Sequence, residues 1–295
     1  MKNKDWFLVF LLGIFWGSSF LFVEILLEYI TPIVIVYLRV AIASVLLFIY
    51  ILIRNNNFQF SKGDLFNLFI MGLLNNVFPF TLIAYGQQST TGGLASILNA
   101  NTSFITILLA ALFLSNEKLN LHRTIGVLIG IFGVVLAVDY QNIFQFDNDN
   151  VGKYLIVIAT ISYSFAGIWA KVKLQNLPPV VCAAGMLTMS TIFLSPYIVS
   201  MHFEELSSLT FNTVKYALGF ALICTVFAYF IYFKILKSTG AGNLLICTII
   251  IPPSSIVLNS IFIGEVINTN EIIGLLVIIV GLLVIDGRVL GKKFV

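Results

Sequence analysis

The stretch Glu117–Val138, EKLNLHRTIGVLIGIFGVVLAV, returns near the end of the chain as Glu265–Ile285, EVINTNEIIGLLVIIVGLLVI. Each copy starts with a glutamate, crosses a short polar segment and continues into an apolar run with glycines at matching positions. Further out, three residues recur about 147 positions later: Pro32 as Pro179, Gly72 as Gly219 and Tyr85 as Tyr232. The chain is therefore an internal duplication over most of its length.

The composition excludes a soluble globular protein. Hydrophobic residues make up 59% of the 295 residues and charged residues only 10%, against about 25% charged in soluble domains. The apolar residues fall in runs of about twenty, and a helix of that length crosses the hydrocarbon core of a bilayer. We predict an all-α integral membrane protein with ten transmembrane helices, at residues 6–27, 33–53, 65–86, 93–114, 122–139, 152–172, 180–200, 213–233, 242–263 and 271–289.

Positive charge separates the predicted loops into two groups. Cytoplasmic loops are enriched in Lys and Arg, so we place both termini in the cytoplasm. Thirteen of the sixteen basic residues then fall on that side: Lys2, Lys4, Arg54, Lys62, Lys118, Arg123, Lys171, Lys173, Lys234, Lys237, Arg288, Lys292 and Lys293. The opposite loops are acidic. A missed or invented span would scramble this separation.

A repeat of five spans, an odd number, must insert its two copies in opposite orientations. We assign residues 1–140 to the first repeat, 141–151 to an external acidic linker and 152–295 to the second repeat. Inverted repeats are a recurrent transporter architecture, because the two halves can exchange inward-open and outward-open roles. The alternative is an old duplication that only forms a stable bundle.

Glycines punctuate the fifth and tenth predicted helices. Gly126, Gly130 and Gly133 lie in the fifth, and Gly274 and Gly281 in the tenth. Small residues at helical spacing let membrane helices approach closely. We expect these glycines to serve packing rather than substrate binding.

Ionisable residues inside spans are costly to bury and are functional candidates. Glu24 and Arg39 lie near the external ends of the first two helices, close enough for an ion pair. Alternatively, Glu24 reaches the headgroups and the long Arg39 side chain snorkels to the interface. The repeat places Lys171 at the position equivalent to Glu24, at the opposite mouth. We interpret Lys171 as an interfacial anchor.

Polar and aromatic residues at mid-depth suggest a cavity. The candidates, together with Glu24 and Arg39, are Trp16, Ser19, Asn75, Tyr85, Asn99, Trp169 and Tyr229. Asn side chains also bond between helices, and Tyr and Trp near span ends also form interfacial belts. Pro252 and Pro253 lie inside the ninth span, where they either form a gating hinge or simply bend the helix.

Enzyme signatures are missing from the sequence. It contains no GxxxxGK[ST] phosphate loop, no HExxH zinc motif and no GxSxG nucleophile elbow. Cys182, Cys224 and Cys247 lie inside apolar runs without metal-ligand spacing. We therefore expect no catalytic residue, no metal, no cofactor, no enzymatic activity and no nucleic-acid partner.

Several motifs resemble the EamA-type transporters of the drug/metabolite transporter superfamily. They are WGSSF at Trp16–Phe20, Pro32 followed by Arg39, ILNANTSFITILLAALFLSNE at Ile97–Glu117, PPSSIVLNSIFIGE at Pro252–Glu265, and the two glycine-bearing runs. Each motif alone is weak, but their order and duplication cover nearly the whole chain.

The resemblance implies ten helices around a central cavity in a bacterial inner membrane, and carriage of small metabolites such as amino acids, commonly outward. Two departures stand out. The family usually has Lys where this chain has Glu24, which would alter substrate charge or coupling. Its fourth helix usually has Pro near Ser103, so a hinge would move to the second repeat.

The sequence thus predicts a secondary transporter that works by alternating access, with the bilayer and a small-molecule substrate as its partners. Arg39 would hold an anionic group, and Glu24 would bind a substrate amine or a coupling proton. Alternatively, transport would be coupled to the movement of a counter-substrate. The rival hypotheses are an intramembrane lipid-modifying enzyme and a non-transporting scaffold. Substrate identity, direction and oligomeric state stay open.

Overall fold

A computed structural model describes residues 3–54, 60–138, 148–239 and 245–287, and all regular structure in these ranges is helical. Nine continuous helical segments there are long and apolar enough to cross a membrane, and the helix Leu121–Ala137 is a shorter tenth. The prediction of an all-α membrane protein with about ten helices is confirmed. Most of the predicted acidic linker (141–147) and the basic residues Lys2, Arg288, Lys292 and Lys293 lie outside the described residues.

The first repeat contains eight regular elements, of which several join end to end into one span. They are α1 (Asn3–Leu27), α2 (Pro32–Ile53), α3 (Lys62–Gly72), η1 (Leu73–Val77), α4 (Phe78–Gly86), α5 (Gly92–Asn99), α6 (Thr102–Phe113) and α7 (Leu121–Ala137).

The second repeat has the same order apart from one short extra helix, α10, and an unbroken ninth span. Its elements are α8 (Asn148–Lys173), α9 (Pro179–Met201), α10 (Phe203–Ser207), α11 (Phe211–Ala221), η2 (Leu222–Phe227), α12 (Ala228–Thr239), α13 (Leu245–Ile263) and α14 (Thr269–Asp286). α8 begins inside the predicted linker.

A π-helical segment interrupts the third span of each repeat. η1 separates α3 from α4, and η2 separates α11 from α12 at the corresponding place. A π segment widens the helix locally and frees side chains to face a new direction, and such segments are frequent at functional sites. The sequence pattern did not predict either one.

The fourth and ninth spans differ in a way that the sequence analysis did not foresee. α5 ends at Asn99 and α6 starts at Thr102. Hydrogen bonds between residues three apart span the break, as where the Asn101 N–H donates to the Leu98 oxygen at 3.1 Å. In the second repeat, α13 continues as helix through Pro252 and Pro253. The helix break therefore lies in the fourth span, which has no proline, and not in the ninth span, which contains Pro252 and Pro253.

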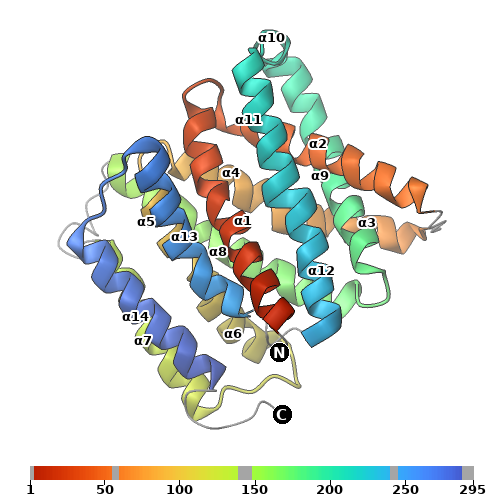
Figure 1. Cartoon of the computed structure of the whole chain (residues 1–295). Helices are drawn as coiled ribbons and strands as arrows, with labels where there is room; N and C mark the ends of the chain where they lie inside the picture. Colours follow the sequence, from red (N-terminus) through yellow and green to blue (C-terminus); the bar gives the residue numbers. More distant parts are fainter. Residues whose placement is uncertain (1–2, 55–59, 139–147, 240–244, 288–295) are drawn as a thin grey trace.

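α7 and α14 form a pair at one side of the bundle (Figure 1), and they contact each other far more extensively than any other helix. Their glycines face each other: a Cβ added at Gly126 would lie 2.8 Å from the main-chain oxygen of Gly281, and one at Gly133 would lie 2.9 Å from that of Gly274. The pairing of early with late residues makes the two helices antiparallel. The expectation that these glycines serve close packing is confirmed.

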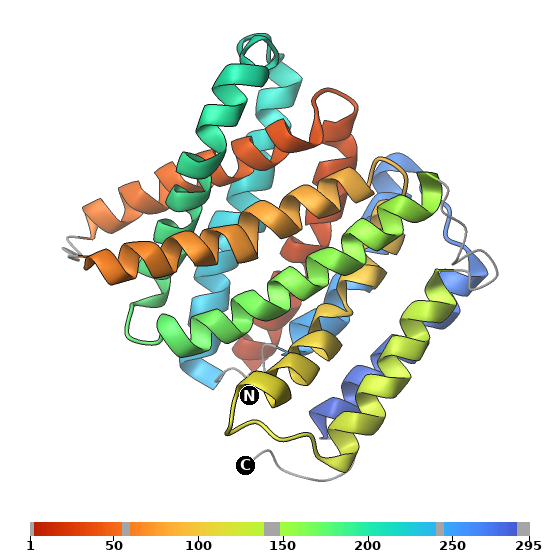
Figure 2. The ribbon, with the colours of Figure 1, turned by 180° about the vertical axis from the view of Figure 1, so that it is seen from behind.

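The remaining helices enclose the interior. α4 runs beside α8 (Figure 2), while α1 contacts α13 and α2 contacts α9. The described N-terminal residues lie at one end of the bundle and α10 at the other (Figure 1). We call these ends the N-terminal face and the opposite face. Each repeat thus packs mainly against the other, which leaves an interior shared by both.

Candidate substrate cavity

A cavity of about 690 Å³ lies between the two repeats. Its walls come from α1 to α6 and from α8, α9, α11, η2, α12 and α13, whereas α7 and α14 contribute no residue. Pockets that bind small molecules commonly measure about 300–1,000 Å³. The space therefore suits a small metabolite, and the α7–α14 pair stands outside it.

Arg39, from α2, is the cationic centre of this cavity. Its side chain is only 9% exposed, and its Nε donates a hydrogen bond to Oγ1 of Thr225 at 3.0 Å. The guanidinium carbon lies 3.8 Å from the ring centre of Phe80 and 4.5 Å from that of Phe220. No ion pair within the described residues joins Arg39 to a carboxylate. The hypothesised pair with Glu24 is not formed.

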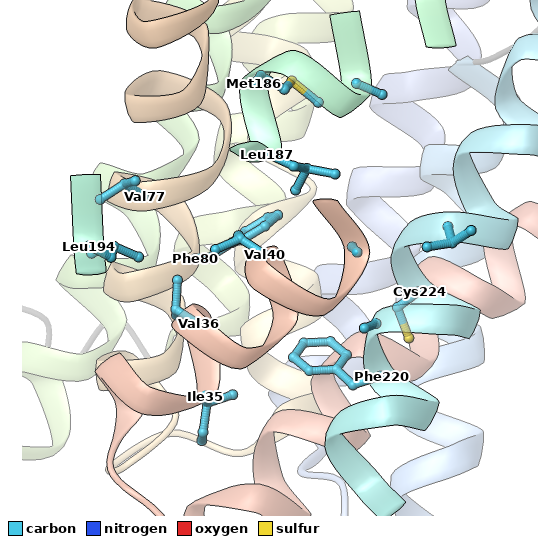
Figure 3. Packing of buried hydrophobic residues seen from close by; sticks show 14 of the residues in the cluster. Ile35, Val36, Val40, Val77, Phe80, Met186, Leu187, Leu194, Phe220 and Cys224 are labelled. Atoms are coloured by element: carbon cyan, nitrogen blue, oxygen red, sulfur yellow. The ribbon is translucent and has the colours of Figure 1, made fainter. Parts of the chain in front are cut away.

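The two phenylalanines come from different repeats and hold the guanidinium in place. Figure 3 shows Phe80 and Phe220 on either side of the α2 turn that carries Val36 and Val40. A guanidinium stacks well on aromatic faces because it is planar and weakly hydrated. The packing thus keeps Arg39 on the cavity wall, and no carboxylate of the described residues pairs with it there.

The π segments supply polar groups to the same region. Thr225, the partner of Arg39, lies in η2, and Asn75 lies in η1. Nδ2 of Asn75 donates to the hydroxyl of Tyr229 at 3.4 Å. Cys224 of η2 also lines the cavity, with its Sγ 3.3 Å from Oγ of Ser18. Each repeat therefore places polar atoms at mid-depth through its distorted third span.

The two ends of the cavity differ. At the N-terminal face it extends to the turn between α8 and α9, where Gln175 and Pro179 are exposed. At the other end the wall includes the buried Gln87, whose Nε2 donates to Oε2 of Glu24 at 2.9 Å and to the main-chain oxygen of Phe20 at 3.0 Å. The cavity is therefore open at one face and closed at the other.

Beyond the closed end, a glutamate of the second repeat caps a helix of the first. Gly264, with φ +72°, ends α13 and turns the chain toward Glu265. Oε1 and Oε2 of Glu265 accept the Gly93 N–H at 2.9 and 3.2 Å, in the first turn of α5. Burial raises the pKa of Glu265, although hydrogen bonds from Thr91 and Gly93 oppose that rise. The contact joins the two repeats at the opposite face.

The equivalent glutamate of the first repeat makes different contacts. Oε1 of Glu117 accepts a hydrogen bond from Nζ of Lys171 at 2.6 Å, and Oε2 accepts one from Nη1 of Arg123 at 2.9 Å. These two cations hold the pKa of Glu117 below its ordinary range. Lys171, predicted as an interfacial anchor, is exposed and makes this ion pair.

Most of the predicted cavity residues do line the cavity. Those that line the space are Trp16, Ser19, Arg39, Asn75, Asn99 and Tyr229, together with Pro252. Pro253 follows in the same helix but does not line it.

Three predicted residues lie elsewhere. Glu24 is separated from the cavity by Gln87. Tyr85 is 41% exposed on the outside of the bundle. The indole Nε1 of Trp169 donates to the main-chain oxygen of Asn67 at 3.1 Å, which fixes that ring between helices. For these three residues the side chain does not line the cavity as predicted.

Sequence reasoning missed Phe80, Phe220 and Gln87. The phenylalanines carry no signal in a chain with 27 Phe residues. Gln87 lies in the polar run Gln87–Thr91, which resembles an ordinary loop. Tyr163 and Tyr232 also line the cavity.

A family model described as the EamA-like transporter family matches this sequence twice, over residues 4–138 and 150–286. The chain belongs to that family. The resemblance noted in the sequence is confirmed, and membership makes this chain a multi-pass membrane transporter.

Relatives of this EamA-like transporter cover nearly its full length. It is 24% identical to the uncharacterized transporter YoaV of Bacillus subtilis over 90% of this chain and 91% of that protein. It is 28% identical to the uncharacterized transporter YetK of the same organism over 94% and 84%. It is 22% identical to the protein PagO of Salmonella typhimurium over 93% and 90%. A solved crystal structure matches all of both chains with a TM-score of 0.71 at 14% identity, which shows a shared fold.

Proposed function

We propose that this transporter is a secondary carrier that moves small carboxylate-bearing metabolites, such as amino acids and related compounds, out of a bacterial cell by alternating access. The observation that supports this proposal is the guanidinium of Arg39 on the wall of the central cavity, which forms no ion pair with any carboxylate in the part of the chain that the structure describes.

The chemistry of Arg39 favours an anionic substrate group. A charged side chain in the hydrocarbon region costs at least about 2.5–3.5 kcal/mol on insertion scales, and such groups normally serve ion or substrate pathways. The fork of N–H donors on a guanidinium matches the two oxygens of a carboxylate. The aromatic rings of Trp16, Tyr163 and Tyr229, which line the same cavity, offer an apolar wall for the rest of the molecule.

The open end of the cavity supports an inward-open conformation. The N-terminal face is the one to which we assign the cytoplasm by its basic loops, and the cavity reaches the surface there. Export would begin with a substrate entering at the turn between α8 and α9. It would end when the opposite face opens and the N-terminal face closes.

The two equivalent glutamates suggest how the faces alternate. Glu265 caps α5 and joins the repeats at the closed face, whereas Glu117 at the open face binds Lys171 and Arg123 instead. In the outward-open state we propose the reverse: Glu265 leaves α5, and Glu117 moves to the start of α13, which is the equivalent helix of the second repeat. Glu117 and Glu265 would thus act as two matched latches, and in each state only one of them would bind a helix of the other repeat.

Counterflow in proteoliposomes tests the proposal. Proteoliposomes that contain the protein are loaded with an unlabelled amino-acid mixture. Uptake of each radiolabelled amino acid is then measured with and without an imposed pH gradient. We expect saturable counterflow by the wild type, its loss in Arg39→Gln, and a drop of about 10-fold or more in Arg39→Lys, since hydrogen bonds to charged groups contribute about 1.5–3 kcal/mol. Arg54→Gln, which changes an exposed arginine at the end of α2, is the matched control.

Different failures point to different corrections. Wild-type counterflow in Arg39→Gln would remove Arg39 from the substrate site. Absence of saturable flux for every compound would favour the scaffold hypothesis. Chemical change of the vesicle lipids would favour the lipid-modifying enzyme.

A further inference from the structure

The side-chain amide of Asn75 is held in one orientation by a chain of hydrogen bonds. Oγ of Ser190 donates to the main-chain oxygen of Met186 at 2.7 Å, so it accepts from Nδ2 of Asn76 at 3.1 Å. Oδ1 of Asn76 therefore faces Asn75 and accepts from its Nδ2 at 3.3 Å. Because the nitrogen of the Asn75 amide faces this acceptor, its oxygen, Oδ1, is turned away from it.

This oxygen belongs to the cavity wall. Nδ2 of Asn75 also lies 3.7 Å from Sδ of Met186 and 3.4 Å from the hydroxyl of Tyr229, and both of these residues line the cavity, as Asn75 itself does. In the part of the chain that the structure describes, Oδ1 of Asn75 has no hydrogen-bond partner, and it remains accessible to solvent, in contrast to the enclosed oxygens of Gln87 and Asn99. It is therefore an acceptor that a molecule in the cavity can use.

Asn75 lies on the same part of the wall as Arg39. The ring of Phe80, which contacts the guanidinium of Arg39 at 3.8 Å, follows Asn75 in the same span, at a rise of about 7–8 Å for a regular helix. From the second repeat, the Tyr229 hydroxyl that bonds Asn75 is close enough to Arg39 for the two groups to interact electrostatically. Nη1 and Nη2 of Arg39 donate to no described residue and are accessible as well. A small molecule that binds these nitrogens has the open oxygen of Asn75 within its reach.

The cavity offers no negative charge to a substrate cation. Arg39 is the only charged side chain among the described residues that line it, and Glu24, for which the sequence suggested a substrate amine, does not line it. A donor group next to a bound carboxylate must therefore find a neutral acceptor, because it loses its hydrogen bonds to water when it enters the site.

We infer that Asn75 is a specificity-determining residue of the carrier, whose Oδ1 accepts a hydrogen bond from an ammonium or hydroxyl group next to the carboxylate held by Arg39. This inference rests on the proposed function and narrows its substrate class to 2-amino and 2-hydroxy carboxylates. A plain carboxylate of the same skeleton leaves Oδ1 of Asn75 unpaired. Sites built around a polar partner reject such analogues strongly for that reason.

A structural role for Asn75 makes a different prediction. If its amide only joins η1 to Tyr229 and Asn76, its loss lowers stability but leaves the ranking of ligands unchanged. The deciding quantity is therefore the ratio of affinities within a set of matched ligands, and not the overall activity.

The experiment measures apparent affinity by ligand-dependent thermal stabilisation of the detergent-purified protein. Each set of ligands keeps one carbon skeleton and varies the group on carbon 2. The sets are alanine, lactate and propanoate; leucine, 2-hydroxy-4-methylpentanoate and 4-methylpentanoate; and phenylalanine, 3-phenyllactate and 3-phenylpropanoate.

In at least one set we expect wild type to bind the amino acid about 10-fold or more tightly than the plain acid, the usual effect of a hydrogen bond to a charged group. The hydroxy acid should fall between them, because hydrogen bonds between neutral groups are weaker. In Asn75→Leu both preferences fall to within about twofold, since the acceptor is gone and the skeleton still fits.

Two further variants keep the test decisive. Asn75→Leu leaves Oδ1 of Asn76 without its donor and could fail to fold. Asn75→Ser is therefore the second variant, because its shorter side chain withdraws the acceptor and leaves room for a water molecule to bond Asn76; it should lose the preference in the same way. Asn212→Leu, the same change at an exposed asparagine of α11, is the matched control and should keep the wild-type ranking.

The outcomes separate the inference from the function on which it rests. The role of Asn75 is overturned if wild type binds the plain acid as tightly as the amino acid in every set, or if either Asn75 variant keeps the wild-type preference. Loss of binding in Arg39→Gln would then leave the carrier proposal intact. No stabilisation of the wild type by any of these compounds contradicts the proposed substrate class and the inference together.

Discussion

At the scale of single residues, Arg39 shows how a charge is kept usable inside a membrane protein. Two phenylalanine rings and one threonine hydroxyl surround it, so the guanidinium is oriented without being neutralised. An acidic partner would have made a buried ion pair that competes with the substrate. The sequence identified Arg39, because any arginine within a span is unusual. It did not identify Phe80 or Phe220, because their role depends on which helices meet.

Glu117 leads to a prediction about pH at this scale. Lys171 and Arg123 lower its pKa from the ordinary value of 4.5. The ion pairs therefore stabilise the protein above that ordinary value, and their contribution disappears as pH falls through the lowered pKa. We expect Glu117→Gln to melt at a lower temperature than wild type at pH 7, and the difference to shrink toward zero with acidification below about 4.5.

The measurement is a melting curve of each protein in detergent across pH. Glu28→Gln, which removes an exposed carboxylate at the opposite face, is the control and should show no such convergence. A difference between wild type and Glu117→Gln that is independent of pH would contradict an electrostatic role for this group.

At the scale of elements, the helices divide into those that form the cavity and those that do not. α7 and α14, whose repeated sequences reveal the duplication, contribute nothing to the cavity wall. Their glycines bring the two backbones into direct contact, which gives the dispersion contacts that replace the hydrophobic effect between helices in lipid. The π segments and the break after α5 lie instead in spans that line the cavity. The regular, closely packed helices α7 and α14 therefore lie outside the cavity, and helices with irregular backbone line it.

The glycine contact gives a prediction for this pair. A Cβ at Gly126 would lie 2.8 Å from the oxygen of Gly281 and 3.0 Å from the nitrogen of Ile285, both main-chain atoms. Gly126→Ala must therefore push the helices apart, at a cost of about 1–3 kcal/mol, typical of overpacking. We expect a lower melting temperature in detergent.

The control is Gly167→Ala in α8, where the nearest atom to an added Cβ, Cγ2 of Thr106, is 3.9 Å away. Because alanine favours helix more than glycine, this variant should match or exceed wild-type stability. Equal melting temperatures for Gly126→Ala and Gly167→Ala would mean that α7 and α14 are not tightly packed.

At the scale of the whole molecule, the two repeats differ in state although they share a fold. The N-terminal face is open to the cavity, whereas the opposite face is closed by Gln87 and Glu24 and joined by Glu265. If the contacts at the two faces were identical, the cavity would be either closed at both faces or open at both. Under the proposed alternating access, the different contacts of Glu117 and Glu265 are what the transport cycle would invert.

Cys182 reports on this asymmetry without adding a new cysteine. It lines the cavity and is partly exposed. In a Cys224→Ser, Cys247→Ser background we expect a membrane-impermeant maleimide to label Cys182 in inside-out vesicles and not in right-side-out vesicles. The added variant Glu265→Ala should reduce labelling, since losing a side-chain acceptor at the first turn of α5 costs about 1 kcal/mol and shifts the equilibrium between the two states about fivefold toward the outward-open state.

Glu204→Ala, at an exposed position of α10, is the control for the loss of a carboxylate and should label like its parent. Labelling of Cys182 only from the right-side-out side would reverse the proposed orientation. Unchanged labelling in Glu265→Ala would show that this glutamate is not a latch.

The sequence by itself determined the class of protein, the number of spans and the duplication. These depend on local quantities, since the free energy of placing a twenty-residue segment in lipid is close to a sum over its own side chains. Glu117–Val138 and Glu265–Ile285 likewise show their kinship without any contact being known. The family followed from the same local motifs.

Only the tertiary structure decided which side chains meet. Whether Trp169 faces the cavity or the carbonyl of Asn67, and whether Glu24 reaches a substrate or is covered by Gln87, depends on the rotation of each helix about its axis. That rotation is set by packing against helices that are distant in sequence, and two π segments shift it further. The sequence therefore indicates where a residue lies along its helix, whereas the direction of its side chain is set by the packing of the assembled bundle.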